Sequence, residues 1–257
     1  MSHNSDNPPL ADSALTHAQH DAVREPLQNT GTAHQDDAIE LLGLLAYTEL
    51  SAQMRLAIDA AQSPTAEYRV AHAHLSAAAY NRMQQVVGII DELGYDGRQH
   101  LLHFNDAYAE YEERTRSQTW HERVLKGYVG HAVALDFCRV ALGTLAEDIQ
   151  ARVKAILDDT EESANARAIL NAKSQADPVL ASRLALWGRR LVGESLHQIQ
   201  QLIAANPALE RLVVGGAHAA EAKPSPRQDQ QNPEVAWLFS QLTAQHTRRM
   251  EKIGLAA

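Results

Sequence analysis

Residues 36–94 constrain the fold most, because they form two long segments with helical apolar periodicity that are separated by Ser63-Pro64. In each segment apolar side chains recur every three or four residues, which is the spacing of one helix face. Glu49 lies in the middle of the first apolar face, and Arg82 lies in the middle of the second. Because a buried charge without a partner is costly, such a charge pairs with another group, binds a metal or loses its ionisation. The pattern predicts long packed helices with charged groups in their interior.

The composition of the whole chain also favours helices. Hydrophobic residues make up 45% of the 257 residues, enough for a sizeable core, whereas aromatic residues make up only 5%. Alanine and leucine dominate, and β-branched runs and Gly or Pro breaks are few. We therefore expect an all-α protein.

The charge and cysteine content narrow the functional classes. A formal net charge of −9 argues against a broad nucleic-acid-binding surface. The single cysteine, Cys138, excludes an internal disulfide and fits a reducing compartment. The chain has no N-terminal apolar stretch of the signal-peptide type and no apolar run of about 18 residues. We therefore expect a cytoplasmic protein without a membrane segment.

The order of polar and periodic segments predicts the domain organisation. Residues 1–35 contain almost no large apolar side chains, which predicts a disordered tail. The histidines in this tail are better interpreted as solvent-exposed polar residues than as metal ligands. Helices are expected at about 36–62, 65–93, 120–142, 145–172, 178–205 and 233–253, with a partly helical crossover at 95–118. Residues 217–232 lack apolar periodicity and predict a flexible linker. The expected units are thus a helical domain at 36–216 and a helix within 233–257 that docks on the bundle or on a second subunit.

Four further segments carry a family resemblance: Ala46-Tyr-Thr-Glu-Leu-Ser51, Leu125-Lys-Gly-Tyr-Val-Gly130 with Asp136-Phe137, Leu184-Ala-Leu-Trp-Gly-Arg-Arg-Leu-Val-Gly-Glu194, and His246-Thr-Arg-Arg-Met250. They resemble an actinobacterial branch of the ferritin-like superfamily, which is usually described as similar to the tRNA 2-methylthio-isopentenyladenosine hydroxylases. The resemblance spans about residues 36–255. It implies a ferritin-like four-helix bundle with additional C-terminal helices. In active members it also implies a di-iron centre that uses O₂ to hydroxylate an apolar substituent.

The ligand set that this resemblance implies is incomplete in the chain. Such a centre takes one carboxylate from one helix of each pair and an acid-x-x-His motif from the other, because residues three apart share a helix face. Glu49 matches the first carboxylate. The first acid-x-x-His falls on Ala79-Tyr-Asn-Arg82, which has neither ligand. The second falls on Asp159-Thr-Glu-Glu162, which keeps a carboxylate and lacks the histidine.

The third helix also departs from the implied set. Ala134 stands where a carboxylate is expected, with His131 and Asp136 as near substitutes. Five residues separate His131 from Asp136, a rotation of about 140°, so both cannot point at one centre.

Three interpretations of Arg82 follow. Its guanidinium neutralises Glu49, and Asp159 or Glu162 as well, in the space where the metals would lie. Alternatively, His72, His74 or His131 supplies a rearranged metal site. In the third interpretation the side chain of Arg82 extends into solvent. Because arginine does not lose its proton, the first interpretation is incompatible with an iron site of ordinary affinity.

The sequence therefore predicts a ferritin-like protein with a degenerate di-iron site, in which Glu49, Asp159 and Glu162 are vestigial ligands and Arg82 is the buried counter-ion. Its expected role is non-catalytic, as a scaffold or as a binder of an apolar ligand, without a cofactor. The alternative is an active non-haem di-iron oxygenase, with iron as cofactor, that hydroxylates an apolar modification on tRNA or a similar substrate. A homo-oligomer is compatible with both hypotheses.

Overall fold

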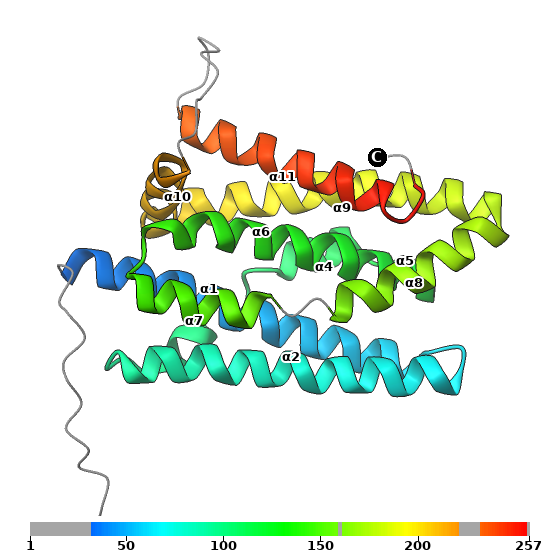
Figure 1. Ribbon diagram of the computed structural model, residues 1–257, viewed down its shortest axis with the longest axis horizontal. Coiled ribbons are helices and arrows are strands. Elements are labelled where there is room, and N and C mark those ends of the chain that lie inside the picture. Colours follow the sequence, from blue (N-terminus) through cyan, green and yellow to red (C-terminus); the bar gives the residue numbers. More distant parts are fainter. Residues whose placement is uncertain (1–31, 159–160, 221–231, 256–257) are drawn as a thin grey trace, which may run out of the picture.

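The computed structural model describes residues 32–158, 161–220 and 232–255, and every element in these ranges is helical (Figure 1). The α-helices are α1 (Thr32–Ala61), α2 (Ala66–Glu92), α3 (Gly97–His103), α4 (Ala109–Arg114), α5 (Trp120–Lys126), α6 (Ala132–Ala141), α7 (Glu147–Leu157), α8 (Glu161–Ala176), α9 (Pro178–Ala205), α10 (Pro207–Ala219) and α11 (Pro233–Glu251). A π turn (η1, Gly127–His131) joins α5 to α6, and a 3₁₀ turn (η2, Leu142–Thr144) follows α6. The expected all-α ferritin-like architecture is confirmed.

The first two helices form the long antiparallel pair that the periodicity predicts (Figure 1). The Thr65 side chain accepts a hydrogen bond from the Tyr68 amide and caps α2. Gly94 follows the helix with a φ of 91°, a left-handed conformation that favours glycine. The apolar stripes of α1 and α2 are almost completely buried against each other and against the third helix.

The third and fourth helices of the bundle are both interrupted. The expected helix at 120–142 has the predicted extent, but the π turn η1 divides it. The prediction of one helix over 145–172 is wrong, because α7 ends at Leu157 and α8 begins at Glu161. Glu161 and Glu162 lie in the first turn of α8, where carboxylates complement the positive end of a helix dipole. The acidic run therefore starts a second helix instead of continuing the first.

The C-terminal helices cover one side of this bundle. Helices α9 and α11 run side by side and both contact α6, while α10 packs against α1, α6 and α9 (Figure 1). Leu238 and Met250 of α11 are fully buried in the common core. The last helix thus docks on its own bundle, which is one of the two expected arrangements.

The predicted domain boundaries shift by a few residues. Helix α1 begins at Thr32, before the predicted start at 36, and α10 continues to Ala219, into the predicted linker. The prediction of a disordered tail covers residues 1–35, and it is wrong for residues 32–35, which belong to α1, while residues 1–31 lie outside the described residues. Most of the predicted linker, residues 221–231, lies outside them as well. None of the described helices combines the length and the hydropathy that a bilayer crossing requires.

Candidate functional site

The two charges that the periodicity places inside the bundle meet there. Glu49 on α1 is fully buried, and the side chain of Arg82 on α2 is 10% exposed. The Nε of Arg82 donates a hydrogen bond of 2.9 Å to Oε2 of Glu49. The pair is therefore a charge-assisted contact in the low-dielectric interior, where losing either partner is costly.

His131 extends this pair to the third and fourth helices. Its Nε2 lies 3.3 Å from Oε1 of Glu49, and its Nδ1 lies 3.3 Å from Oε2 of Glu162 on α8. The ring belongs to the π turn, a helix irregularity that often occurs at functional sites. One imidazole thus bridges two buried carboxylates through its opposite nitrogens.

A second arginine, Arg55, and a third carboxylate, Asp59, continue the alternation of charges. Arg55 on α1 contacts Glu162 and also Asp59, whose carboxylate is fully buried. The Nε of Arg123 on α5 donates to Asp59 at 2.8 Å. We call this set the ion-pair network: Arg82, Glu49, His131, Glu162, Arg55, Asp59 and Arg123. It joins all four helices of the bundle.

The network determines the ionisation of its members. Burial by itself lowers the pKa of His131, but the carboxylates of Glu162 and Glu49 outweigh burial and raise this pKa to about 9. Burial raises the pKa of Glu49, yet His131 and Arg82 outweigh it and hold the pKa below its ordinary value. Arg55 and His131 likewise overcome burial and hold the pKa of Glu162 far below its usual range. His131 is therefore a cation between two carboxylates at neutral pH.

The remaining predicted ligands that the structure describes lie away from the network. Asp159 lies outside the described residues. His72 is buried with its Nδ1 2.8 Å from the Tyr68 carbonyl, whereas His74 is exposed beside Glu161, so the two do not converge. Asp136 pairs with Arg139 and Arg249, away from His131, as the five-residue spacing predicts.

Sequence reasoning missed the half of the network that Arg55 and Asp59 form. A signal was present, because Asp59 continues the three-four stripe that runs from Glu49 through Ala52 and Leu56. A buried carboxylate in that register requires a cation, and Arg55 stands four residues before it, where helical side chains meet.

The residues present do not fit the di-iron centre that a ferritin-like fold implies. In the described part of the chain, no three His, Cys, Asp or Glu side chains are placed to hold one metal ion. A space of about 150 Å³ lies beside the network, and its described lining includes two carboxylates, Glu49 and Glu162. The same lining includes four cationic side chains: Arg82, His131, Arg139 and Arg249. A divalent cation in this space would meet repulsion that the arginines cannot relieve by losing a proton.

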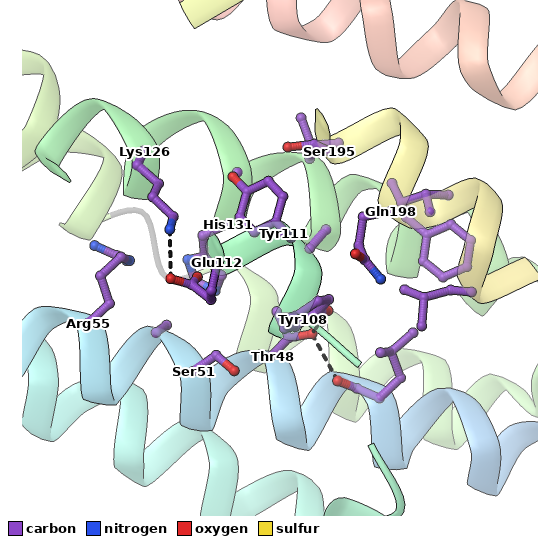
Figure 2. A pocket seen from close by; sticks show the side chains of 18 residues that line it. Thr48, Ser51, Arg55, Tyr108, Tyr111, Glu112, Lys126, His131, Ser195 and Gln198 are labelled. Carbon is purple, nitrogen blue, oxygen red and sulfur yellow. Dashed lines mark hydrogen bonds and ion pairs between the residues drawn. The ribbon is translucent and has the colours of Figure 1, made fainter. Parts of the chain in front are cut away.

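A separate cavity of about 70 Å³ lies on the other side of His131, between α1, α4, α6 and α9 (Figure 2). Its lining includes apolar side chains, among them Leu44, Val133, Phe137, Ile199 and Leu202, together with the polar side chains of Thr48, Ser51, Ser195 and Gln198. Its polar end carries Arg55, Tyr111, Glu112 and Lys126. An outer pocket of about 570 Å³ shares five lining residues with the cavity and connects it to the surface.

A family profile identifies the architecture that carries this site. The profile of the ferritin-like domain of actinomycetes matches residues 32–216, which include α1 to α9 and most of α10. The chain belongs to this ferritin-like family. Among proteins with curated descriptions, none matches it. The matched range contains the whole ion-pair network and every residue of the cavity, so both belong to the ferritin-like domain itself.

Proposed function

We propose that this ferritin-like protein is a non-catalytic binding protein that holds a small apolar molecule in the cavity between α1, α4, α6 and α9. The observation that carries the proposal is that the centre of the bundle is closed by ion pairs, from Arg82 through Glu49 and His131 to Glu162 and Arg55. These side chains pair with one another in the part of the bundle where the resemblance implies ligands to iron, although Oε2 of Glu162 makes no hydrogen bond of normal geometry. The centre therefore acts as a structural clamp, and the adjoining cavity is free to bind a ligand.

The lining of the cavity favours a binder over a pure scaffold. Apolar side chains from three helices surround an open space, whereas well-packed interiors leave few voids larger than a water molecule. Pockets that combine apolar walls with a few polar groups are the usual binding sites for small molecules. A protein that only presents its outer surface to a partner has no need of this space.

The alternative is an oxygenase related to the tRNA hydroxylases, with iron as cofactor. It is favoured by one observation, the imidazole of His131 between two buried carboxylates. Against it stand the guanidinium groups of Arg82 and Arg55, which pair with those carboxylates. The relationship to tRNA substrates stays a prediction.

A calorimetric titration with 1-hexanol tests the binding proposal. We expect saturable binding of one molecule per chain. Ala134→Leu, which places a larger side chain in the cavity wall, should abolish it. Ala132→Leu on the same helix faces the other space and serves as the control. Equal binding by Ala134→Leu and the wild type would contradict the proposed site.

A further inference from the structure

The polar end of the cavity holds a lysine whose partner is held loosely. Lys126 on α5 has a side chain that is only 8% exposed, and its Nζ lies 2.6 Å from Oε2 of Glu112 (Figure 2). Glu112 is 60% exposed and belongs to α4, a helix of six residues without a side-chain cap. The buried member of this pair is therefore the cation, and the carboxylate is a surface group that a second carboxylate can replace.

A neighbouring phenol has no acceptor in normal hydrogen-bond geometry. Among the described contacts the buried hydroxyl of Tyr111 makes no such bond, as holds for several other buried polar atoms, although the side chain of Ser195 is near enough to interact with it. Ser195 lies on the same side of the cavity (Figure 2), and its hydroxyl donates to the Leu191 carbonyl at 2.8 Å, which leaves its oxygen able to accept. Burial raises the pKa of Tyr111 to about 12, so the phenol keeps its proton and remains a donor. A ligand oxygen in the cavity would give this donor a better-placed acceptor.

The other phenol of the cavity shows the contrast. Tyr108 lies 2.6 Å from the hydroxyl of Thr48, and Thr48 donates its own proton to the Leu44 carbonyl. Tyr108 is therefore the donor to Thr48, and its proton is used. Of the two phenols, Tyr108 has an acceptor at 2.6 Å, whereas Tyr111 has no hydrogen bond of normal geometry among the described contacts.

The charges of the lining agree with an anionic ligand. The described lining residues include three cations, Arg55, Lys126 and His131, against the single carboxylate of Glu112. The carboxylates that pair with Arg55 and His131 lie behind the wall in the ion-pair network. An anion that enters the polar end thus meets positive charge and a phenol donor, while its apolar part can contact the apolar side chains of the lining.

We propose that the cavity binds a short-chain monocarboxylic acid as its anion, with the carboxylate on Lys126 in place of Glu112 and accepting a hydrogen bond from Tyr111. This assignment rests on the proposed function and specifies its ligand. The cavity as a whole has about half of the ~150 Å³ that hold a benzene ring in an engineered apolar cavity, and three residues of its polar end, Arg55, Glu112 and Lys126, also line the outer pocket of about 570 Å³. With the carboxylate in the wider polar end, a chain of about four to six carbons fits.

Titration of the full chain with hexanoate, 1-hexanol and hexylamine tests the ligand class. Hexanoate should bind about ten-fold or more tightly than hexanol, which is the effect of one charge-assisted hydrogen bond, and hexylamine should not bind. Equal affinity for hexanol and hexanoate would overturn the assignment of an acid and leave the apolar binding site intact. If none of the three ligands binds, both the assignment of an acid and the proposed binding function are overturned.

Substitutions at the polar end give a second test, because some of them should weaken hexanoate binding and one should tighten it. Lys126→Met should weaken hexanoate about ten-fold or more without weakening hexanol, and Tyr111→Phe should weaken hexanoate in the same sense. Glu112→Gln should tighten hexanoate, because it removes the internal competitor for Lys126. Glu110→Gln on the same helix is the control, since Glu110 pairs with Arg114 at the surface. A Glu112→Gln protein that binds hexanoate no more tightly than the wild type would contradict the exchange of carboxylates.

Discussion

Arg82 is the residue on which the interior electrostatics depend, because its guanidinium pairs with a fully buried carboxylate. The Nε–Oε2 contact with Glu49 leaves little of either group in water. Removing one partner of a buried pair leaves the other charge uncompensated, which costs more than the pair itself contributes. The stability of the bundle should therefore respond strongly to this one side chain.

Arg82→Ala should lower the free energy of unfolding by about 3–5 kcal/mol, as breaking a buried ion pair does. Urea unfolding followed by circular dichroism measures the change. Arg152→Ala is the matched control, because Arg152 and Glu92 are 42% and 43% exposed and form an ordinary surface pair. That control should cost less than about 1 kcal/mol. An equally small loss for Arg82→Ala would remove the basis for a buried counter-ion.

His131 predicts a specific dependence of stability on pH. Its pKa rises from an ordinary 6.5 to about 9 in the folded chain, so its contribution is complete below about pH 6.5 and is lost as the pH rises through 9. The lowered pKa values of Glu49 and Glu162 contribute in the opposite direction, since their stabilisation is present above 4.5 and is lost as the pH falls below it.

Chemical denaturation between pH 5 and about 9.5 tests this prediction. The wild type should lose stability above pH 6.5, and His131→Gln should be less stable at pH 6 and show a flatter alkaline limb. His74→Gln, at an exposed histidine, should keep the wild-type profile. A His131→Gln protein with an unchanged alkaline limb would exclude this histidine as the titrating group.

The interior charges show which contacts of the site can be predicted from the spacing of residues in the sequence. Glu49 and Arg82 are predictable, because each interrupts an apolar stripe at helical spacing, and their contact follows once the two helices pair. The bridge through His131 to Glu162 is not predictable from spacing, since it depends on where the third and fourth helices bend. Glu162 is therefore a candidate ligand in the sequence and an ion-pair partner in the structure.

At the scale of elements, the π turn of residues 127–131 places the third helix against α1 and α4. A Cβ at Gly127 would overlap the Arg55 guanidinium, and a Cβ at Gly130 would overlap the Tyr111 hydroxyl. These two glycines let one side chain of the network and one of the cavity lie directly on the helix backbone. The turn thus links the structural clamp to the proposed binding site.

Gly127→Ala should lower the free energy of unfolding by about 1–3 kcal/mol, because its backbone is ordinary helix and only the added methyl group collides with Arg55. Gly193→Ala on α9 is the control, since a methyl group added there would have no neighbouring atom within 4 Å. That change should be neutral or stabilise by up to about 1 kcal/mol. Thermal unfolding of the two variants distinguishes the displacement of Arg55 by the new methyl group from the general effect of Gly→Ala on helix propensity. A Gly127→Ala protein that is more stable than the wild type would contradict the close contact with Arg55.

The break between α7 and α8 marks the limit of prediction at this scale. Apolar periodicity continues on both sides of residues 158–160, so a single helix is the natural expectation. Helix α8 contacts α5 and α9 and brings Glu162 to Arg55 and His131. The acidic residues in its first turn are a local signal for a new helix, whereas the partners of Glu162 lie far away in the sequence and no local pattern predicts them.

Considered as a whole, the molecule keeps the ferritin-like arrangement and fills its centre with its own charges. All four bundle helices contribute to the ion-pair network, and the C-terminal helices α9 to α11 close one side of the core. The fold class follows from composition and periodicity, because long amphipathic helices with short connections have few ways to pack. In the proposed function, this internal neutralisation takes the place of a metal centre.

Iron binding tests that property most directly. The purified chain, dialysed anaerobically against excess Fe²⁺ and then freed of unbound metal, should retain far less than one iron per chain by elemental analysis. Subsequent exposure to O₂ should produce no oxo-bridged absorption band. Retention of about two irons per chain, the content of a di-iron bundle, together with such a band would contradict the account.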